Sequence, residues 1–298
     1  MELRVHSLVG MYEQSGWIPT FPMVYGDRSA MIGHHQAALV SDAWFKGIRN
    51  FDVEKAYEAL KKNAMEGTMI PWQTGPATEI DDFYRENGYF PAIGPEEKEF
   101  IPQVNSFEQR QAVAVTLEHA YDDWCLANLA AALGKKEDAE YFFQRGLNYK
   151  NVFNQETGFM SPKRSDGTWV EPFDPRFGHG IGSRAYFAEV NGWNYLWHVQ
   201  HDPAGLIQLL GGEKEASEKL DQMFNEPLGM AKWMFKGRFP DATGITGQFV
   251  MGDEPGFHVP YLYNYTGEAW KTQKRIKMLM DTWFTNSLLG ICGDEDGG

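Results

Sequence analysis

The sequence predicts an all-α protein and, among helical folds, favours an α/α toroid with long loops and few short strands. Apolar side chains recur at three- and four-residue steps in roughly eight to ten segments, whereas the two-residue alternation of strands is nearly absent. Without a strand–helix–strand rhythm, a helical bundle, an α-solenoid and a toroid remain. No repeat of about 20 to 50 residues supports a solenoid. Two Gly- and Pro-rich stretches, 66–105 and 154–184, are long enough to build a site, and a toroid gathers such loops around a funnel.

The first half of the chain contains four predicted helices, at 35–48, 51–65, 111–133 and 135–153. Asp52 is a plausible N-cap for the second of them. The third is rich in Ala and ends at Gly134, and the fourth follows at once. We therefore expect the third and fourth helices to form an antiparallel hairpin.

The second half contains shorter helical patterns, at 185–199, 204–210, 213–224, 227–235 and 268–286. A chain of 298 residues with 43% hydrophobic and 23% charged residues is typical of a soluble globular domain. Its length predicts one large domain or two ordinary ones.

The composition excludes several classes of protein. A net charge of −14 argues against binding to nucleic acid, which requires clustered Lys and Arg. No run approaches the ~18 apolar residues of a membrane span, and no signal peptide is visible at the N-terminus. Cys125 and Cys292 form no metal-binding pattern or disulfide framework. Aromatic residues make up 14% of the chain, which suits either a large core or the sugar-stacking surfaces of a carbohydrate cleft.

Glu189 is the first candidate for chemistry. It precedes an aromatic-rich segment in FAEVNGWNYLWHVQHD (187–202), with Trp193 four residues later. One interpretation is a carboxylate favoured by the dipole at a helix N-terminus. The other is a general acid, because desolvation beside Trp raises the pKa of a carboxyl group and keeps it protonated near neutrality.

Asp253 and Glu254 form the second candidate, in a GDEP turn followed by His258 and several aromatic residues. Acidic oxygens on a turn suit Ca²⁺, which takes six to eight oxygen ligands. The alternative is a turn that only caps the following helix. The sequence contains two further acidic segments. We interpret YDDW (121–124) as part of a structural network and the stretch 169–184 as a surface loop.

Asp294 and Asp296 lie in the terminal GDED and, taken alone, resemble a solvated acidic tail. Glycoside hydrolysis with inversion needs two carboxyl groups about 6.5–9.5 Å apart, one as acid and one as base. Glu189 as the acid and Asp294 or Asp296 as the base would satisfy that scheme.

Stretches in a fixed order along most of the chain resemble the α-mannosidases of glycoside hydrolase family 92. They include SGWIPTFPM, MIGHHQAALVSDAWFKGIRNFDVEKAYEALKKNA, LEHAYDDWCLANLAAALGKKEDAEYF, NYKNVFNQETGFMSPK, DGTWVEPFDPRF, EVNGWNYLWHVQHDPAGLI, GDEPGFHVPYLYNYTGEAWKTQ and GICGDEDGG. The resemblance implies that residues 1–298 are a fragment of an (α/α)₆ catalytic toroid. It also implies exo-hydrolysis of α-mannosides, of the N-glycan or mannan type, with inversion. It also implies a Ca²⁺ that binds mannose hydroxyls.

The resemblance also implies roles for individual residues. Glu189 corresponds to the general acid, and Asp294 and Asp296 to the carboxylates that activate water, with Asp296 as the base. Asp253 and Glu254 lie where the family builds its metal and mannose site. The other residues expected to bind substrate are Trp17 and Trp193, which would stack on sugar rings, His35 of the MIGxH motif, and His258.

Departures from the family pattern refine these expectations. Met251 and Gly252 stand where members specific for α-1,2 linkages carry a His-Glu pair, so α-1,2 specificity does not follow from the resemblance. The family's N-terminal β-sandwich domain and the region after GDED have no counterpart. The sequence therefore predicts an incomplete toroid that is weakly active or is completed by a partner chain. Members of the family are mostly secreted or periplasmic.

Two other readings stay open at this point. One is another (α/α)₆ carbohydrate-active enzyme, such as a glucoamylase-like hydrolase or a uronate lyase. The few Lys and Arg in the candidate loops count against a lyase, which must neutralise a uronate carboxylate. The other is a non-catalytic helical domain that binds sugar.

Overall fold

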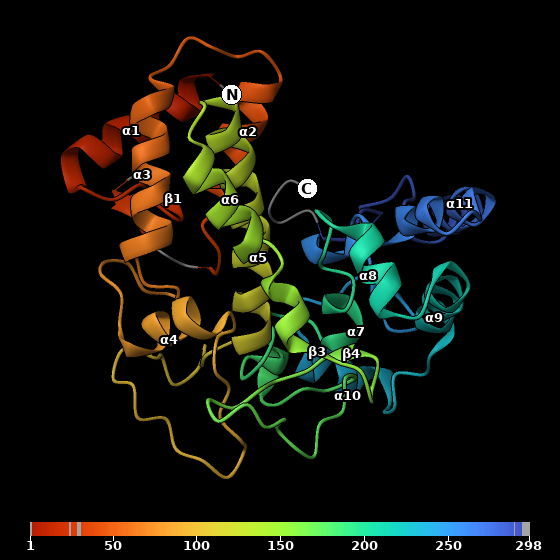
Figure 1. The fold of residues 1–298 in the computed structure, drawn as a ribbon. Coiled ribbons are helices and arrows are strands. Elements are labelled where there is room, and N and C mark those ends of the chain that lie inside the picture. The colour runs from red at the N-terminus through yellow and green to blue at the C-terminus, as the bar shows by residue number, and fades with distance from the viewer. Residues whose placement is uncertain (1, 24, 29–30, 289, 294–298) are drawn as a thin grey trace. The chain divides into compact units, whose positions relative to one another are not determined.

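The computed structural model describes residues 2–23, 25–28, 31–288 and 290–293 (Figure 1). The chain divides into two compact units. Unit 1 comprises Met1–Val152 and Pro162–Val170, and unit 2 comprises Phe153–Ser161 and Glu171–Gly298.

Unit 1 is built of helices around one apolar core. Its elements are α1 (Glu2–Ser15), the hairpin of β1 (Pro22–Met23) and β2 (Gly26–Asp27), α2 (Gln36–Phe45), α3 (Val53–Glu66), α4 (Glu79–Asn87), α5 (Ala112–Ala132), α6 (Lys136–Arg145) and the 3-10 helix η1 (Asn148–Val152). The predicted helices at 35–48, 51–65 and 111–133 are confirmed. Asp52 caps α3 as expected, because its carboxylate accepts a hydrogen bond from the Lys55 amide at 3.0 Å.

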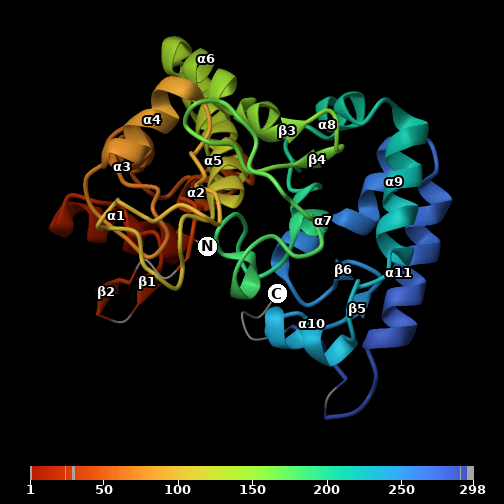
Figure 2. The same ribbon diagram turned by 90° about the horizontal axis from the view of Figure 1, so that it is seen from below.

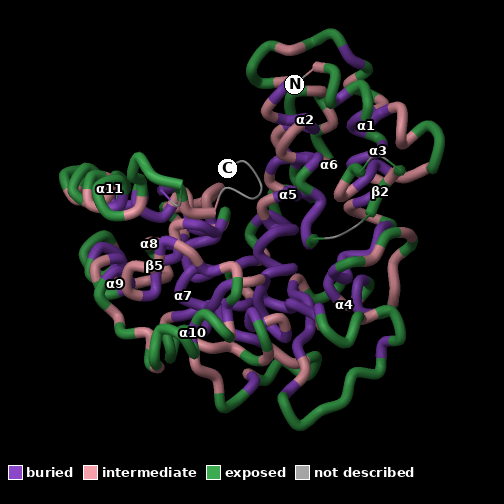
Figure 3. Tube along the Cα trace, turned by 180° about the vertical axis from the view of Figure 1, so that it is seen from behind, coloured by how far each residue is buried: buried purple, intermediate pink, exposed green. Residues whose placement is uncertain are grey.

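Helix α5 is the centre of unit 1. It is buried along most of its length (Figure 3) because apolar side chains occupy nearly every face of the helix. Gly134 adopts a φ of +77° and ends the helix, so that α6 returns beside α5. The apolar core of the unit includes Val5, Leu8, Val40, Tyr57, Leu60, Leu126, Leu129 and Phe142.

Three details of unit 1 differ from expectation. Helix α1 was not predicted, because its sequence has no strong amphipathic pattern, yet Val5 and Leu8 on one face pack into the core. Helix α4 lies within the stretch expected to be a loop, where Thr78 and Asp81 form a capping box. The helix predicted at 135–153 ends at Arg145, because its chain passes close to α5 at Gly146 and continues as 3-10 helix.

Unit 2 consists of shorter elements. They are β3 (Phe153–Asn154) paired with β4 (Phe159–Met160), the 3-10 turn η2 (Ile181–Ser183), α7 (Gly192–Tyr195), α8 (Pro203–Leu209), α9 (Glu213–Asn225), α10 (Lys232–Arg238), β5 (Ile245–Thr246) paired with β6 (Phe249–Val250), the 3-10 helices η3 (Glu254–Gly256) and η4 (Val259–Tyr265), and α11 (Ala269–Trp283). Every strand in the described residues has two residues, so the prediction of few short strands is confirmed.

Helices α9 and α11 lie side by side in unit 2 (Figure 2). Asp221 of α9 joins them, because its carboxylate accepts hydrogen bonds from Lys271 at 2.8 Å and Arg275 at 3.0 Å. The Tyr263 hydroxyl donates to the same carboxylate at 2.9 Å. These helices confirm the patterns at 213–224 and 268–286, and α8 confirms the pattern at 204–210.

Two predicted helices of unit 2 are wrong in extent. The pattern at 185–199 contains only the single turn of α7, because Glu189 has a left-handed backbone with φ +63° and Asn191 is extended. The pattern at 227–235 is displaced to α10, because Gly229 at φ +75° interrupts the chain before the helix begins. In the described part of the chain, no helix is both long and apolar enough to cross a membrane.

The acidic pair in YDDW belongs to a buried structural network, as predicted. Asp123 accepts a hydrogen bond from Arg145 of α6 at 2.8 Å, and both side chains are less than 10% exposed. Asp122 accepts one from the His34 amide at 2.5 Å. The pair of Asp123 and Arg145 therefore joins α5 to α6 by a charge interaction shielded from water.

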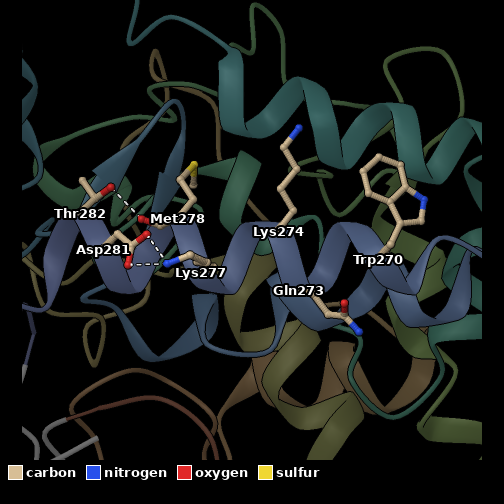
Figure 4. Close-up of a pocket in the computed structure, with 7 residues that line it drawn as sticks. All are labelled: Trp270, Gln273, Lys274, Lys277, Met278, Asp281 and Thr282. Atoms are coloured by element: carbon tan, nitrogen blue, oxygen red, sulfur yellow. Dashed lines mark hydrogen bonds and ion pairs between the residues drawn. The ribbon is translucent and has the colours of Figure 1, made fainter.

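Replacement of Arg145 by Met should lower the free energy of unfolding by about 3–5 kcal/mol, because Asp123 would be left buried without its cation. Urea denaturation measures the change. The matched control is Lys277→Met on α11, where Lys277 and Asp281 form an exposed ion pair at 2.8 Å (Figure 4). That control should cost less than about 1 kcal/mol, and equal losses for the two variants would contradict the buried-pair interpretation.

Candidate functional site

The first two acidic residues of the site, Asp253 and Glu254, follow the β5–β6 hairpin. Gly247 makes its tight turn at φ +61°, and the chain then runs from Val250 to Asp253 at the start of η3. The carbonyl of Asp253 accepts a hydrogen bond from the Gly256 amide at 2.9 Å. Asp253 is 4% exposed, whereas Glu254 is exposed.

Glu189 reaches the same place from the long loop before α7. Its backbone is in the left-handed region, which costs a residue other than Gly on the order of 1–3 kcal/mol and occurs often at functional sites. A Cβ on Gly182 would lie 3.4 Å from the Cα of Glu189, so the loop packs closely against this residue. The strained conformation turns the chain before α7 begins.

Glu189, Asp253 and Glu254 together form the acidic cluster. One carboxylate oxygen from each lies within 4.8 Å of the others. It is the one group of three or more His, Cys, Asp and Glu side chains, among the described residues, that could hold a metal ion. Three carboxylates at this spacing repel one another unless a proton or a cation intervenes. The structure thus brings Glu189 together with both acidic residues of the GDEP turn, and their roles in catalysis and metal binding stay predictions.

His258 and Trp193 lie in the same unit as the acidic cluster. The Nε2 of His258 donates a hydrogen bond to the carbonyl of Trp197 at 2.6 Å, since a carbonyl only accepts. Trp193 is 3% exposed, and its ring meets Phe159 edge-on with centroids 4.8 Å apart. This burial favours a packing role for Trp193, and the stacking of a sugar on its ring stays a prediction.

Lys219 of α9 lies over the rings of Phe159 and Trp193. Its ammonium lies 3.9 Å from the ring centroid of Phe159 and 4.8 Å from that of Trp193. Desolvation lowers the pKa of Lys219. The cation therefore braces the aromatic pair by a cation–π contact.

Trp17 and His35 belong to unit 1. The Lys62 ammonium lies 4.5 Å from the ring centroid of Trp17, which is partly exposed. His35 lies between two carboxylates of α5, with Nδ1 at 3.0 Å from Asp122 and Nε2 at 3.3 Å from Glu118. Desolvation lowers the pKa of His35, but the charge and hydrogen bond of Asp122 and the charge of Glu118 raise it by more, to about 10. The contact of Trp17 and His35 with substrate stays a prediction.

Asp294 and Asp296 lie outside the described residues. The chain is described as far as Gly293, whose backbone packs directly on that of Gly252. A Cβ on Gly252 would lie 3.1 Å from Gly293 N and would collide with Thr243 Oγ1. Gly252 immediately precedes Asp253, so the chain up to Gly293 runs beside the GDEP turn.

A group of buried amides lies on the two segments that carry the acidic cluster, and no sequence pattern predicts it. Asn191, Asn194 and Gln248 are each at most 1% exposed and hydrogen-bond to one another. The Asn before GW is a recognisable helix cap. Its partner Gln248 is distant in the chain, so no local pattern could reveal the contact.

Two hollows on the described surface are lined by residues other than those of the acidic cluster. An open groove of about 600 Å³ follows one face of α11 (Figure 4) and is lined by Trp270, Gln273, Lys274, Lys277, Met278, Asp281 and Thr282. A second hollow lies between α10 and the end of the described chain, lined by residues that include Lys232, Lys236, Trp283 and Cys292. None of the acidic-cluster residues lines either hollow.

Comparison with known proteins identifies relatives along the whole chain. A family model described as the glycosyl hydrolase family 92 catalytic domain matches residues 1–298. An inverting mannosidase of family GH92 from Bacteroides thetaiotaomicron is 34% identical, with a TM-score of 0.77 over 99% of this chain and 37% of the relative. A second α-mannosidase of that family and bacterium, solved with mannoimidazole, is 30% identical, with a TM-score of 0.81 over 99% of this chain and 36% of the relative.

A secreted glycosidase of Arthroderma benhamiae, described as uncharacterized, is 25% identical over 98% of this chain and 37% of its own length. The chain thus spans little more than a third of the length of these relatives. The structural likeness confirms the predicted fold class, the all-α (α/α)₆ toroid type.

The charge on His35 predicts a pH-dependent contribution to stability. Because its folded-state pKa of about 10 exceeds the ordinary value of 6.5, the contribution is complete below about pH 6.5 and is lost as the pH rises through 10. Replacement by Gln should therefore lower the melting temperature at pH 6 and have little effect near pH 10.5. His6, an exposed residue of α1, is the control position, and His6→Gln should leave the melting temperature unchanged throughout. A His35→Gln effect that is constant with pH would refute the assignment.

Proposed function

Because the chain belongs to glycosyl hydrolase family 92, we propose that it hydrolyses α-mannosides, releasing mannose from chain ends with inversion in a Ca²⁺-dependent reaction. The observation that carries the proposal is the acidic cluster, which joins Glu189 to Asp253 and Glu254 within 4.8 Å. The two solved relatives are mannosidases, which supports the choice of sugar.

Glu189 is proposed as the general acid. Its carboxylate lies within 4.8 Å of those of Asp253 and Glu254, so a sugar held at the GDEP turn would lie beside it. It would transfer its proton to the glycosidic oxygen as the bond from that oxygen to the anomeric carbon breaks. The leaving sugar or alcohol would depart as a neutral hydroxyl compound, and Glu189 would be left as a carboxylate.

Asp296, with Asp294 beside it, is proposed as the base. It would take one proton from a water molecule whose oxygen bonds to the anomeric carbon from the opposite face. Mannose would then be released with the β configuration. The packing of Gly293 on Gly252 supports this assignment, because Gly293, the last described residue, lies beside the GDEP turn.

Asp253 and Glu254 are proposed as ligands of the metal. Carboxylate oxygens are the ligands that Ca²⁺ prefers, and two oxygens on opposite sides of one ion lie about 4.6–5.2 Å apart. The spread of 4.8 Å in the acidic cluster is compatible with that size. A bound Ca²⁺ would supply positive charge and coordination sites for sugar hydroxyls.

Replacement of Glu189 by Gln tests the acid. It should lower turnover of α-mannobioses by about 10²- to 10⁴-fold, because the leaving oxygen would depart unprotonated. A dinitrophenyl α-mannoside has a leaving group that needs no proton, so its turnover should fall far less. Proton NMR should detect β-mannose as the first product of the wild-type protein.

The control for this variant is Glu213→Gln at the exposed start of α9, which should retain wild-type rates. Equal losses on both substrates would exclude Glu189 as the acid. Binding of mannobiose by the wild type without turnover would favour a sugar-binding domain instead.

Removal of Ca²⁺ tests the metal. EDTA should abolish mannose release and added Ca²⁺ should restore it, and Asp253→Asn should weaken Ca²⁺ binding at least about tenfold in calorimetry. Asp281→Asn on α11 provides the control, because this exposed carboxylate is remote in sequence from the cluster. Glu189→Gln should leave Ca²⁺ affinity within a few-fold, whereas a loss as large as that of Asp253→Asn would make Glu189 a ligand rather than the acid.

A further inference from the structure

Three buried amides connect the two segments that carry the acidic cluster. We name Asn191, Asn194 and Gln248 the amide clamp. Asn191 and Asn194 belong to the N-cap and body of α7, and Gln248 lies in the turn between β5 and β6. Their exposed fractions are 1%, 1% and 0%, so water does not compete for their hydrogen bonds.

Asn191 is the centre of the clamp. Its Nδ2 donates to Gln248 Oε1 at 2.8 Å and to the Arg176 carbonyl at 2.9 Å. Its Oδ1 accepts from the Trp193 amide at 3.2 Å and from Asn194 Nδ2 at 3.0 Å. This one side chain therefore links the loop before Glu189, the first turn of α7 and the β5–β6 turn.

The other two amides complete the link. Asn194 Nδ2 donates to the Gln248 carbonyl at 3.0 Å, and its Oδ1 accepts from the Val250 amide at 3.2 Å. Gln248 Nε2 donates to the Pro227 carbonyl at 2.7 Å. Each amide oxygen and nitrogen of the clamp thus has a partner, as buried polar groups require.

The clamp lies close in sequence to Glu189 and to Asp253. Asn191 follows Glu189 by two residues, and Val250 precedes Asp253 by three. Glu189 holds a left-handed backbone that persists only where the flanking chain is fixed. If apolar side chains made this contact, the α7 segment and the β5–β6 hairpin could shift relative to each other. Paired hydrogen-bond donors and acceptors permit only one alignment of the two segments.

We propose that Asn191, Asn194 and Gln248 are positioning residues that set the separation of Glu189 from Asp253 and Glu254. The structural part of this proposal is independent of the reaction, and its consequence for metal binding and catalysis rests on the proposed function. The clamp works without adding a charge to the site, because all three side chains are neutral.

Gln248→Met is the direct test, because Met has a similar size and lacks both hydrogen-bonding groups. Hydrogen exchange followed by mass spectrometry should show about tenfold faster exchange in both 186–197 and 248–256, with no change in α5 of unit 1. The matched control is Asn63→Leu, since Asn63 is a buried amide of unit 1 whose Nδ2 donates to the Ile18 carbonyl at 2.8 Å. The control should leave both segments of unit 2 unchanged.

Faster exchange around residue 248 alone, or a uniform increase in both units, would overturn the proposal. If Gln248→Met does not fold, Gln248→Asn replaces it, because the shorter side chain cannot reach Asn191 and Pro227 together. The same two criteria then apply.

Calcium titration and mannose release extend the test. Gln248→Met should weaken Ca²⁺ binding about tenfold and lower kcat more than it raises KM, whereas Asn63→Leu should change neither at a temperature where both variants are folded. Wild-type Ca²⁺ affinity and kcat in Gln248→Met would overturn the positioning role. If the wild type neither binds Ca²⁺ nor releases mannose, the proposed function fails, and the exchange experiment alone decides the clamp.

Discussion

The close approach of three carboxylates is the constraint that the loops of unit 2 have to satisfy. Glu189, Asp253 and Glu254 approach within 4.8 Å, although none of them lies inside an α-helix or a strand. Such a cluster is stable only if the backbone on both sides is held from outside and if a proton or a cation reduces the charge. The short hairpin, the single turn of α7 and the buried amides between them provide that support, which explains why regular structure is brief here and side-chain hydrogen bonds are many.

Both charges and neutral amides satisfy buried polar groups in this protein. In unit 1, Arg145 pairs with the buried Asp123, and the half-exposed His35 lies between the buried carboxylates of Glu118 and Asp122. In unit 2, the neutral amides of Asn191, Asn194 and Gln248 join the segments that carry Glu189 and Asp253. These amides fix the register of the two segments without adding a charge to the three carboxylates.

Much of unit 1 could be predicted from sequence because its information is local. The Ala-rich pattern of α5 and the cap at Asp52 each predict an element from neighbouring residues. In unit 2, an aromatic-rich run predicted a long helix at 185–199, yet the left-handed Glu189 and the bonds from Asn194 to the β5–β6 hairpin leave only one turn. Those contacts join residues more than fifty positions apart, and no periodicity records them. Glu189 and the GDEP turn were recognisable as motifs, whereas Gln248 was visible only in three dimensions.

The pairing of Gly252 with Gly293 shows how strongly close packing restricts sequence beside the cluster. The backbones approach so nearly that a Cβ on either residue would collide with the other segment or with Thr243. Gly252 does not have a positive φ, so the requirement for Gly comes from space and not from backbone conformation. A longer side chain at 252 would have to move either the segment ending at Gly293 or the turn that carries Asp253. Residue 252 is consequently coupled to the geometry of the acidic cluster even though it has no side chain with which to take part in chemistry.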